Sequence, residues 1–84
     1  MTRVKRVNGH NAIAEAVEKS LNEYFQHLDG ESPDDIYRMV IDNVEKALFA
    51  NVMQRADGNQ THAADMLGIN RTTLRTKLKT HRLA

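Results

Sequence analysis

The sequence predicts an all-α fold, a four-helix subunit in which two long helices precede a C-terminal helix-turn-helix. Two long segments repeat apolar residues at three- and four-residue steps, as one face of a helix requires. The 84 residues include only one proline and four glycines, which favour turns. No segment beyond the first few residues alternates apolar and polar residues as a β-strand does. A monomer of this size buries only about 60% of its unfolded surface, so the length favours an oligomer.

The N-terminal part is expected to contain a flexible basic arm and then one amphipathic helix. Residues 1–12 form the arm, which includes Arg3, Lys5 and Arg6. The helix is predicted from residue 13 to residue 28, before the turn signal Asp29-Gly30. Its apolar face consists of Ile13, Val17, Leu21, Tyr24, Phe25 and Leu28.

A second, longer helix is predicted to begin after Ser32 and to end near Arg55. Ser32 is a suitable N-cap, Pro33 suits the first helical position, and the two carboxylates that follow complement the helix dipole. The turn signal Asp57-Gly58 marks its end. A helix of this span is roughly 33 Å long, whereas a compact monomer of this length is only about 30 Å across.

Residues 13–57 are therefore predicted to form the dimerisation region of an intertwined homodimer, whose four body helices share one core. The apolar residues of the long helix cover too much of its circumference for a single contact. Phe49, Met53 and Ala56 point around to another side, where they are expected to dock the C-terminal module. The alternative to a dimer is that Phe49 and Met53 simply extend the core of a monomer. The predicted dimer core is Ile13, Val17, Leu21, Phe25, Ile36, Val40, Val44 and Leu48.

The segment QTHAADMLGINRTTLRTKLK, residues 60–79, predicts a helix-turn-helix within a C-terminal region of residues 58–84. Small Ala64 lies where two helices would cross closely, and Gly68 follows where the chain must turn. Asn70 is a good N-cap for a second helix that begins at Arg71. The apolar residues that would seal the two helices are Ala63, Leu67, Ile69, Leu74 and Leu78, and His81 shares the stripe of the last two.

The distribution of charge favours double-stranded DNA as the partner of this module. Residues 59–84 carry five basic side chains against one acidic, whereas residues 14–58 carry four basic against ten acidic. Arg71 and Arg75 lie one helical turn apart and are able to enter a major groove together. The alternatives are ordinary solvated charges on a helical hairpin, or a helical dimerisation and protein-interaction module without specific DNA reading.

The run from Gly58 to Lys79, together with the two preceding helices, resembles the factor for inversion stimulation (Fis) family from about Ala12 onward. The resemblance implies a homodimeric, nucleoid-associated protein of the bacterial cytoplasm that bends DNA at degenerate sites. It also implies roles in transcription regulation and in site-specific recombination, with RNA polymerase or a recombinase as further partners. Specificity would then come in large part from the cost of deforming the DNA.

The resemblance also implies roles for individual residues. Asn70, Arg71 and Arg75 match the positions that approach base edges. The positions that match or adjoin backbone contacts are Asn59, Gln60, Thr61, His62, Thr73, Lys77 and Lys79. Three residues depart from the usual pattern: His62 replaces an arginine, and Thr76 and Thr80 replace lysines. Family members that activate invertases carry a longer arm that forms a β-hairpin; with about a dozen residues before the first helix, a full hairpin is not expected here.

Nothing in the sequence indicates an enzyme, a cofactor or a metal site. The four histidines are scattered without metal-ligand spacing, and cysteine is absent, so neither a thiolate zinc site nor a disulfide framework is available. No nucleophile motif or glycine-rich phosphate loop is present. Without a long apolar run or a signal-peptide pattern, the chain is expected to be cytoplasmic.

Overall fold

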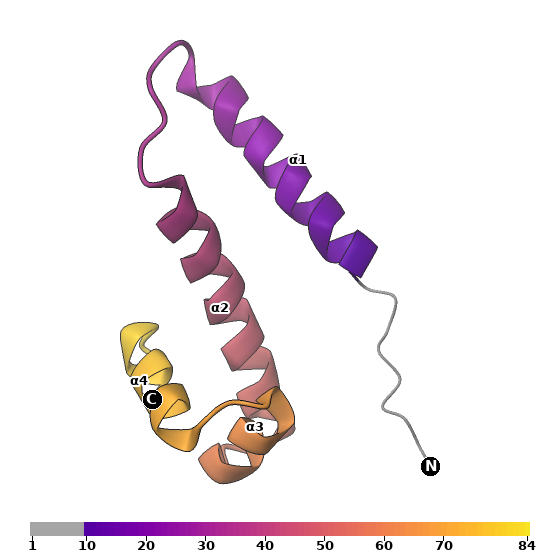
Figure 1. Cartoon of the computed structure of the whole chain (residues 1–84), viewed down its shortest axis with the longest axis vertical. Coiled ribbons are helices and arrows are strands. Elements are labelled where there is room, and N and C mark those ends of the chain that lie inside the picture. Colours follow the sequence, from indigo (N-terminus) through magenta and orange to yellow (C-terminus); the bar gives the residue numbers. More distant parts are fainter. Residues whose placement is uncertain (1–9) are drawn as a thin grey trace. The chain divides into compact units, whose positions relative to one another are not determined.

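The computed structural model describes residues 10–84, and these residues form four α-helices and no strand (Figure 1). The helices are α1 (His10–Leu28), α2 (Ile36–Arg55), α3 (Gln60–Leu67) and α4 (Arg71–Thr80). The all-α prediction is confirmed for this part of the chain, and the predicted arm lies mostly outside the described residues. None of the helices described is long and apolar enough to cross a membrane. The chain divides into two compact units, one ending at Ile36 and the other spanning Tyr37–Ala84.

In the first unit, α1 begins three residues before the predicted start at Ile13 and ends at Leu28 as predicted. The apolar spacing could not locate the true start, because the preceding residues do not belong to the apolar pattern. Asp29 and Gly30 follow the helix with positive φ angles of 54° and 90°, and the Glu31 N–H donates to the Leu28 carbonyl oxygen at 3.1 Å.

The predicted start of α2 at Ser32 and Pro33 is wrong, because the helix begins at Ile36. Asp35 adopts a left-handed conformation with φ 56°, which a continuing right-handed helix excludes. The backbone N–H of Asp34 donates to Tyr24 Oη at 3.4 Å. The two aspartates therefore precede α2 instead of occupying its first turn, and α2 has 20 residues, a length of about 30 Å.

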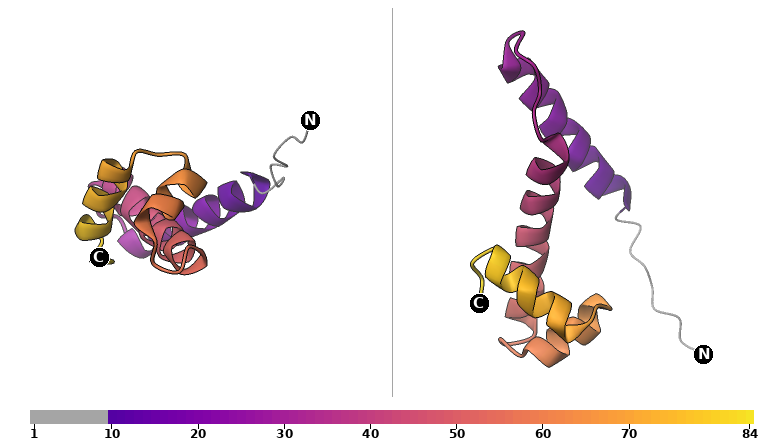
Figure 2. Two further views of the ribbon diagram at one scale, coloured as in Figure 1. Left: turned by 90° about the horizontal axis from the view of Figure 1, so that it is seen from below. Right: turned by 60° about the vertical axis from the view of Figure 1, so that its left-hand side comes forward.

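The second unit has a small apolar core between the later part of α2 and the two short helices, which lie beside its C-terminal end (Figure 2). The prediction that Phe49, Met53 and Ala56 dock the C-terminal module is confirmed: Phe49 and Ala56 are buried and Met53 packs against them. Leu74 and Leu78 of α4 are the largest fully buried side chains among the described residues. The core consists of Phe49, Ala56, Ala63, Ala64, Leu74 and Leu78, with Val52, Met53, Leu67, Ile69 and Leu83 packed around it.

Large apolar side chains also remain exposed within the single chain. Of the predicted dimer core, Ile13 is 63% exposed, and Phe25, Val44 and Leu48 are between 42% and 48% exposed. The other four, Val17, Leu21, Ile36 and Val40, are half-buried. None of the eight belongs to the buried core of the subunit. Their burial in a dimer stays a prediction.

Candidate nucleic-acid interface

A tight turn at Gly68 joins α3 to α4. Gly68 has φ 74°, and its N–H points back to the carbonyl oxygens of Ala64 at 2.9 Å and Asp65 at 3.2 Å. The Ile69 N–H also donates to the Ala64 carbonyl at 3.1 Å, which closes the end of α3. A β-carbon on Gly68 would meet nothing within 4 Å, so the left-handed backbone, and not space, is what favours glycine here.

The start of α3 is fixed by the loop that leaves α2. Asp57 and Gly58 have φ angles of 54° and 79°, and the Gly58 N–H donates to the Met53 carbonyl at 3.0 Å, so the predicted end of α2 is confirmed. Asn59 caps α3, because its Oδ1 accepts the backbone N–H of His62 at 3.0 Å. This cap places the side chains of Thr61 and His62 in an exposed first turn.

Asn70 caps α4 as predicted. Its backbone is extended, with φ −69° and ψ 142°, and its Oδ1 accepts the backbone N–H of Thr72 at 2.7 Å. Since the side-chain oxygen of Asn70 caps the helix, its Nδ2 group is left as a hydrogen-bond donor for a ligand. Arg71 follows as the first residue of α4, beside the positive end of the helix dipole.

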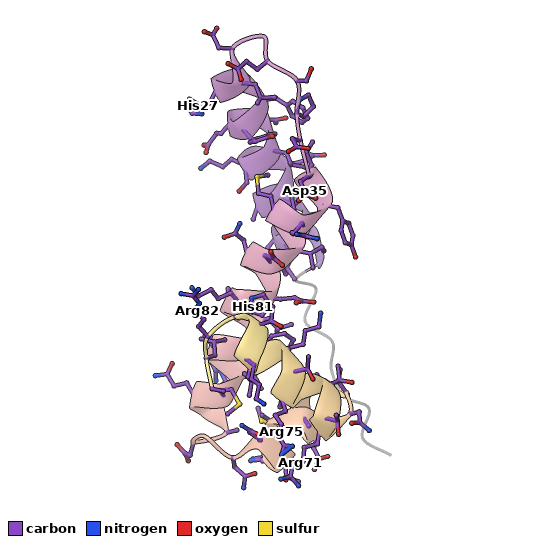
Figure 3. All side chains as sticks on the ribbon, turned by 90° about the vertical axis from the view of Figure 1, so that its left-hand side faces the viewer. His27, Asp35, Arg71, Arg75, His81 and Arg82 are labelled. Atoms are coloured by element: carbon purple, nitrogen blue, oxygen red, sulfur yellow. The ribbon has the colours of Figure 1, made fainter. Side chains whose placement is uncertain are left out.

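The two sides of α4 differ in burial as the sequence predicts. Leu74 and Leu78 are fully buried, and His81 is only 7% exposed. Arg71 and Arg75 lie near the N-terminal end of α4, and His81 and Arg82 near its other end (Figure 3). The exposed residues of the helix are Arg71, Thr72, Thr73, Arg75, Thr76, Lys79 and Thr80.

Thr76 and Thr80, which stand where the resemblance implies lysines, use their hydroxyl groups on the helix itself. Thr76 Oγ1 donates to the Thr72 carbonyl at 3.1 Å, and Thr80 Oγ1 donates to the Thr76 carbonyl at 3.0 Å. Each hydroxyl proton therefore has an acceptor within α4. Neither side chain supplies a cation to the exposed face.

A polar cluster that the sequence did not reveal joins α2 to the last turn of α4. Glu45 Oε2 lies 3.1 Å from Lys77 Nζ, and Glu45 Oε1 lies 3.0 Å from His81 Nε2. The hydrogen bond from His81 lowers the pKa of Glu45 below its ordinary value; desolvation opposes this effect, and the hydrogen bond and charge of Lys77 add to it. Lys77 and His81 stand one turn apart, but their spacing alone could not identify a partner 32 and 36 residues away.

The structure thus brings together some of the predicted site residues and separates others. Asn70, Arg71 and Arg75 share the first turns of α4, and Lys79 is exposed in its last turn. Lys77 has an acidic partner within the protein, so its contact with a DNA backbone stays a prediction. The residues placed at the start of α3 are Asn59, Gln60, Thr61 and His62, of which only Gln60 is partly buried.

Comparison with known proteins gives consistent results. Residues 40–81 match a family described as bacterial regulatory protein, Fis family. A Fis-like DNA-binding protein of Ralstonia nicotianae is 48% identical over 73 residues, which cover 87% of this chain and 95% of the relative. A Fis-like DNA-binding protein of Pseudomonas aeruginosa is 48% identical over 71 residues, 84% of this chain and 68% of the relative. The DNA-binding protein Fis of Actinobacillus succinogenes is 51% identical over 67 residues, 80% of this chain and 68% of the relative.

Proposed function

The chain belongs to the Fis family of bacterial regulatory proteins, and from this we propose that it is a sequence-tolerant DNA-binding protein that inserts α4 into the major groove. The observation that carries the proposal is the division of α4 into a buried apolar side and an exposed basic side. Leu74 is fully buried whereas Arg71 and Arg75 are exposed, so the packing of the module leaves the arginines available to a ligand.

Three side chains at the start of α4 are proposed to read bases. Arg71 and Arg75 are able to donate two hydrogen bonds each to the O6 and N7 atoms of guanine. Asn70 retains only its Nδ2 group as a free donor, because its Oδ1 accepts from Thr72. That polarity suits the acceptor atoms of a base edge, such as N7 of a purine or O4 of thymine.

The residues that contact the DNA backbone are proposed to lie on either side of these three base-reading residues. Thr73 and Lys79 are exposed on α4, and Thr61 and His62 are exposed in the first turn of α3. Asn59 caps α3, and together with Gln60 it lies where helical N–H groups begin, a favourable place for phosphate. These contacts would set affinity, while the base contacts would set sequence preference.

A salt series tests DNA binding directly. We expect fluorescence anisotropy to show binding of the wild-type protein to a labelled duplex, with log affinity falling linearly as log salt rises. A duplex selected by the protein from a random-sequence pool should bind more tightly than a scrambled duplex of the same composition. Failure to bind any duplex at low salt would favour the alternative, a helical dimerisation and protein-interaction module.

We also propose that the active form is a homodimer. The support is the set of apolar side chains that the single chain leaves exposed on both α1 and α2, among them Ile13, Phe25, Val44 and Leu48. Full burial of such a side chain is worth roughly 1.5–3 kcal/mol relative to full exposure, and a second copy would supply the part of this that the single chain leaves unburied. A two-fold dimer also presents two recognition helices to two half-sites, as helix-turn-helix proteins commonly do.

DNA bending follows as a further proposal from the family resemblance. If the two recognition helices lie closer than one helical turn of DNA, the duplex must curve to admit both. A gel assay with the binding site placed at permuted positions along a fragment should then show mobility that depends on the position of the site. Transcription regulation, recombination, contacts with RNA polymerase or a recombinase, and a place on the bacterial nucleoid in the cytoplasm are proposed on the resemblance alone.

A further inference from the structure

Glu45 connects the middle of α2 to the end of the proposed recognition helix. Its two carboxylate oxygens are used separately: one lies 3.1 Å from Lys77 Nζ and the other 3.0 Å from His81 Nε2. Phe49, one turn further along α2, places its ring 6.1 Å from the His81 imidazole. The last turn of α4 is therefore held by two polar contacts and one ring contact from a single face of α2.

The polar contacts have directional requirements that the apolar core lacks. Leu74 and Leu78 attach α4 to the core, but apolar contacts are non-directional and leave a short helix some freedom to tilt. The His81 side chain is only 5% exposed, so water is poorly placed to replace the carboxylate as its partner. An ionised Glu45 accepts hydrogen bonds from His81 Nε2 and from Lys77 Nζ at the same time. These two bonds together fix the orientation of α4 relative to α2.

A helix released at His81 would turn about the leucines that stay buried, and this tilt also moves its N-terminal end. Leu78 lies seven residues after Arg71, a distance of about 10.5 Å along the helix axis. A tilt of about 5° about Leu78 would therefore move the Arg71 backbone by about 0.9 Å. Functional side chains must be held within roughly 0.5 Å of their productive geometry, so this displacement is enough to misalign a bidentate contact.

We propose that Glu45 is a positioning residue for DNA reading, which sets the orientation of α4 through Lys77 and His81. The inference rests on the proposed DNA binding, because orientation matters only if α4 is the element that reads bases. Glu45 itself is expected to make no contact with DNA, since an acidic side chain would repel phosphate. Its effect is on sequence preference, through the alignment of Arg71 and Arg75.

The test compares two substitutions that remove the same charge from the same helix. Glu45→Gln keeps the size of the side chain but loses the charge shared by Lys77 and His81. Asp42→Asn is the matched control, because Asp42 is exposed and lies one turn earlier on α2. For each variant, affinity is measured for the selected duplex and for the scrambled duplex, and the specificity ratio is the quotient of the two affinities.

The two variants should differ in their effect on the specificity ratio. Asp42→Asn should tighten binding to both duplexes alike and leave the ratio unchanged, since it removes only a general repulsion. Glu45→Gln should lower the ratio by roughly tenfold, about the effect of one lost arginine–guanine contact. If Glu45→Gln instead behaves like Asp42→Asn, the positioning role is overturned. A wild-type protein with no preference for the selected duplex would overturn the proposed function itself.

A second pair of variants decides the question if Glu45→Gln does not fold at the measuring temperature, as judged by circular dichroism. His81→Gln retains an N–H donor for Glu45, whereas His81→Leu fills the same space without one. The specificity ratio should stay near the wild-type value for His81→Gln and fall for His81→Leu. Equal ratios for the two folded variants would show that the hydrogen bond to Glu45 does not align α4.

Discussion

Arg71 and Arg75 have the exposure and spacing needed to read bases, whereas Lys79 stands near the other end of α4. We expect Arg71→Ala and Arg75→Ala each to cost roughly 1–3 kcal/mol of discrimination against a scrambled duplex. Lys79→Ala should weaken binding to selected and scrambled duplexes alike, because a phosphate contact carries no sequence information. Anisotropy titrations of both duplexes measure this, and equal losses for all three variants would contradict the base-reading roles.

His62 tests whether the backbone footprint of the family applies to this chain. The side chain is exposed in the first turn of α3, whose N-terminus is closed by Asn59. If His62 faces phosphate, His62→Arg adds one cation per subunit, and the slope of log affinity against log salt should steepen by about 2 for a dimer. Sequence preference should change little. An unchanged slope would show that His62 does not contact the DNA backbone.

Glu45 is expected to make the stability of the protein depend on pH in the acidic range. Its pKa in the folded protein is lowered, chiefly by the hydrogen bond from His81, from an ordinary value of 4.5. The unfolded chain therefore takes up the proton first as pH falls, so the stabilisation is complete above about pH 4.5 and is lost as pH falls through the lowered value.

Denaturant unfolding of wild type and Glu45→Gln between pH 7 and pH 3 measures this loss. The difference in unfolding free energy should be greatest at the neutral end and should shrink below pH 4.5, because a protonated glutamic acid resembles glutamine. A difference that stays constant over the whole range would show that ionisation of Glu45 does not stabilise the fold.

At the scale of secondary-structure elements, the end of α4 contains an unfavourable backbone conformation. Arg82 has φ 59°, and the N–H of the next residue, Leu83, donates to the Leu78 carbonyl at 2.7 Å. This arrangement commonly has glycine at the left-handed position. Arg82 is exposed, so Arg82→Gly should raise the unfolding free energy by about 0.5–1 kcal/mol. Arg82→Ala, which keeps the β-carbon, is the control. Thermal unfolding should show no such increase in the unfolding free energy of this variant.

The elements of the second unit were predictable because each depends on local signals. The cap at Asn70 and the turn at Gly68 are confirmed by hydrogen bonds within a few residues, and the stripe of Leu74 and Leu78, which helical periodicity predicts, is confirmed by their burial. The start of α2 was not predictable from Ser32 and Pro33, since a favourable cap sequence competes with the left-handed turn at Asp35. The contact of Asp34 with Tyr24 is a tertiary one, ten residues away in the sequence.

The candidate site divides in the same way between local and tertiary information. The sequence predicts that Arg71 and Arg75 are exposed, because helical periodicity places them opposite the buried leucines. The link from Glu45 to His81 was not identified, because periodicity describes which side of a helix is buried and not which helix covers it. The prediction that His81 belongs to the packing stripe is confirmed, but only the folded chain brings its carboxylate partner beside it.

At the scale of the whole molecule, the main prediction is that the dimer is the folded unit. Val44 is 42% exposed in the single chain, so an aspartate there would be tolerated by a stable monomer. In a dimer the same substitution would bury an unpaired charge and cost several kcal/mol. We therefore expect Val44→Asp to unfold the protein and the wild-type melting temperature to rise with protein concentration.

Gln54→Glu provides the control, because it adds the same charge at an exposed position of the same helix. That variant should remain folded, with a melting temperature close to wild type. Sedimentation equilibrium at micromolar concentration provides a second measurement. A folded wild-type monomer, or a folded Val44→Asp monomer, would contradict the obligate dimer.

The positions of the two tyrosines determine which process the intrinsic fluorescence of this protein can follow. The chain has no tryptophan, so its ultraviolet emission comes from Tyr24 and Tyr37. Tyr24 belongs to α1, and Tyr37, which is 78% exposed, opens the second unit far along the chain from α3 and α4. Tyrosine fluorescence should therefore follow subunit association with no added label. A tryptophan introduced near the start of α4 would let its own fluorescence follow DNA binding separately.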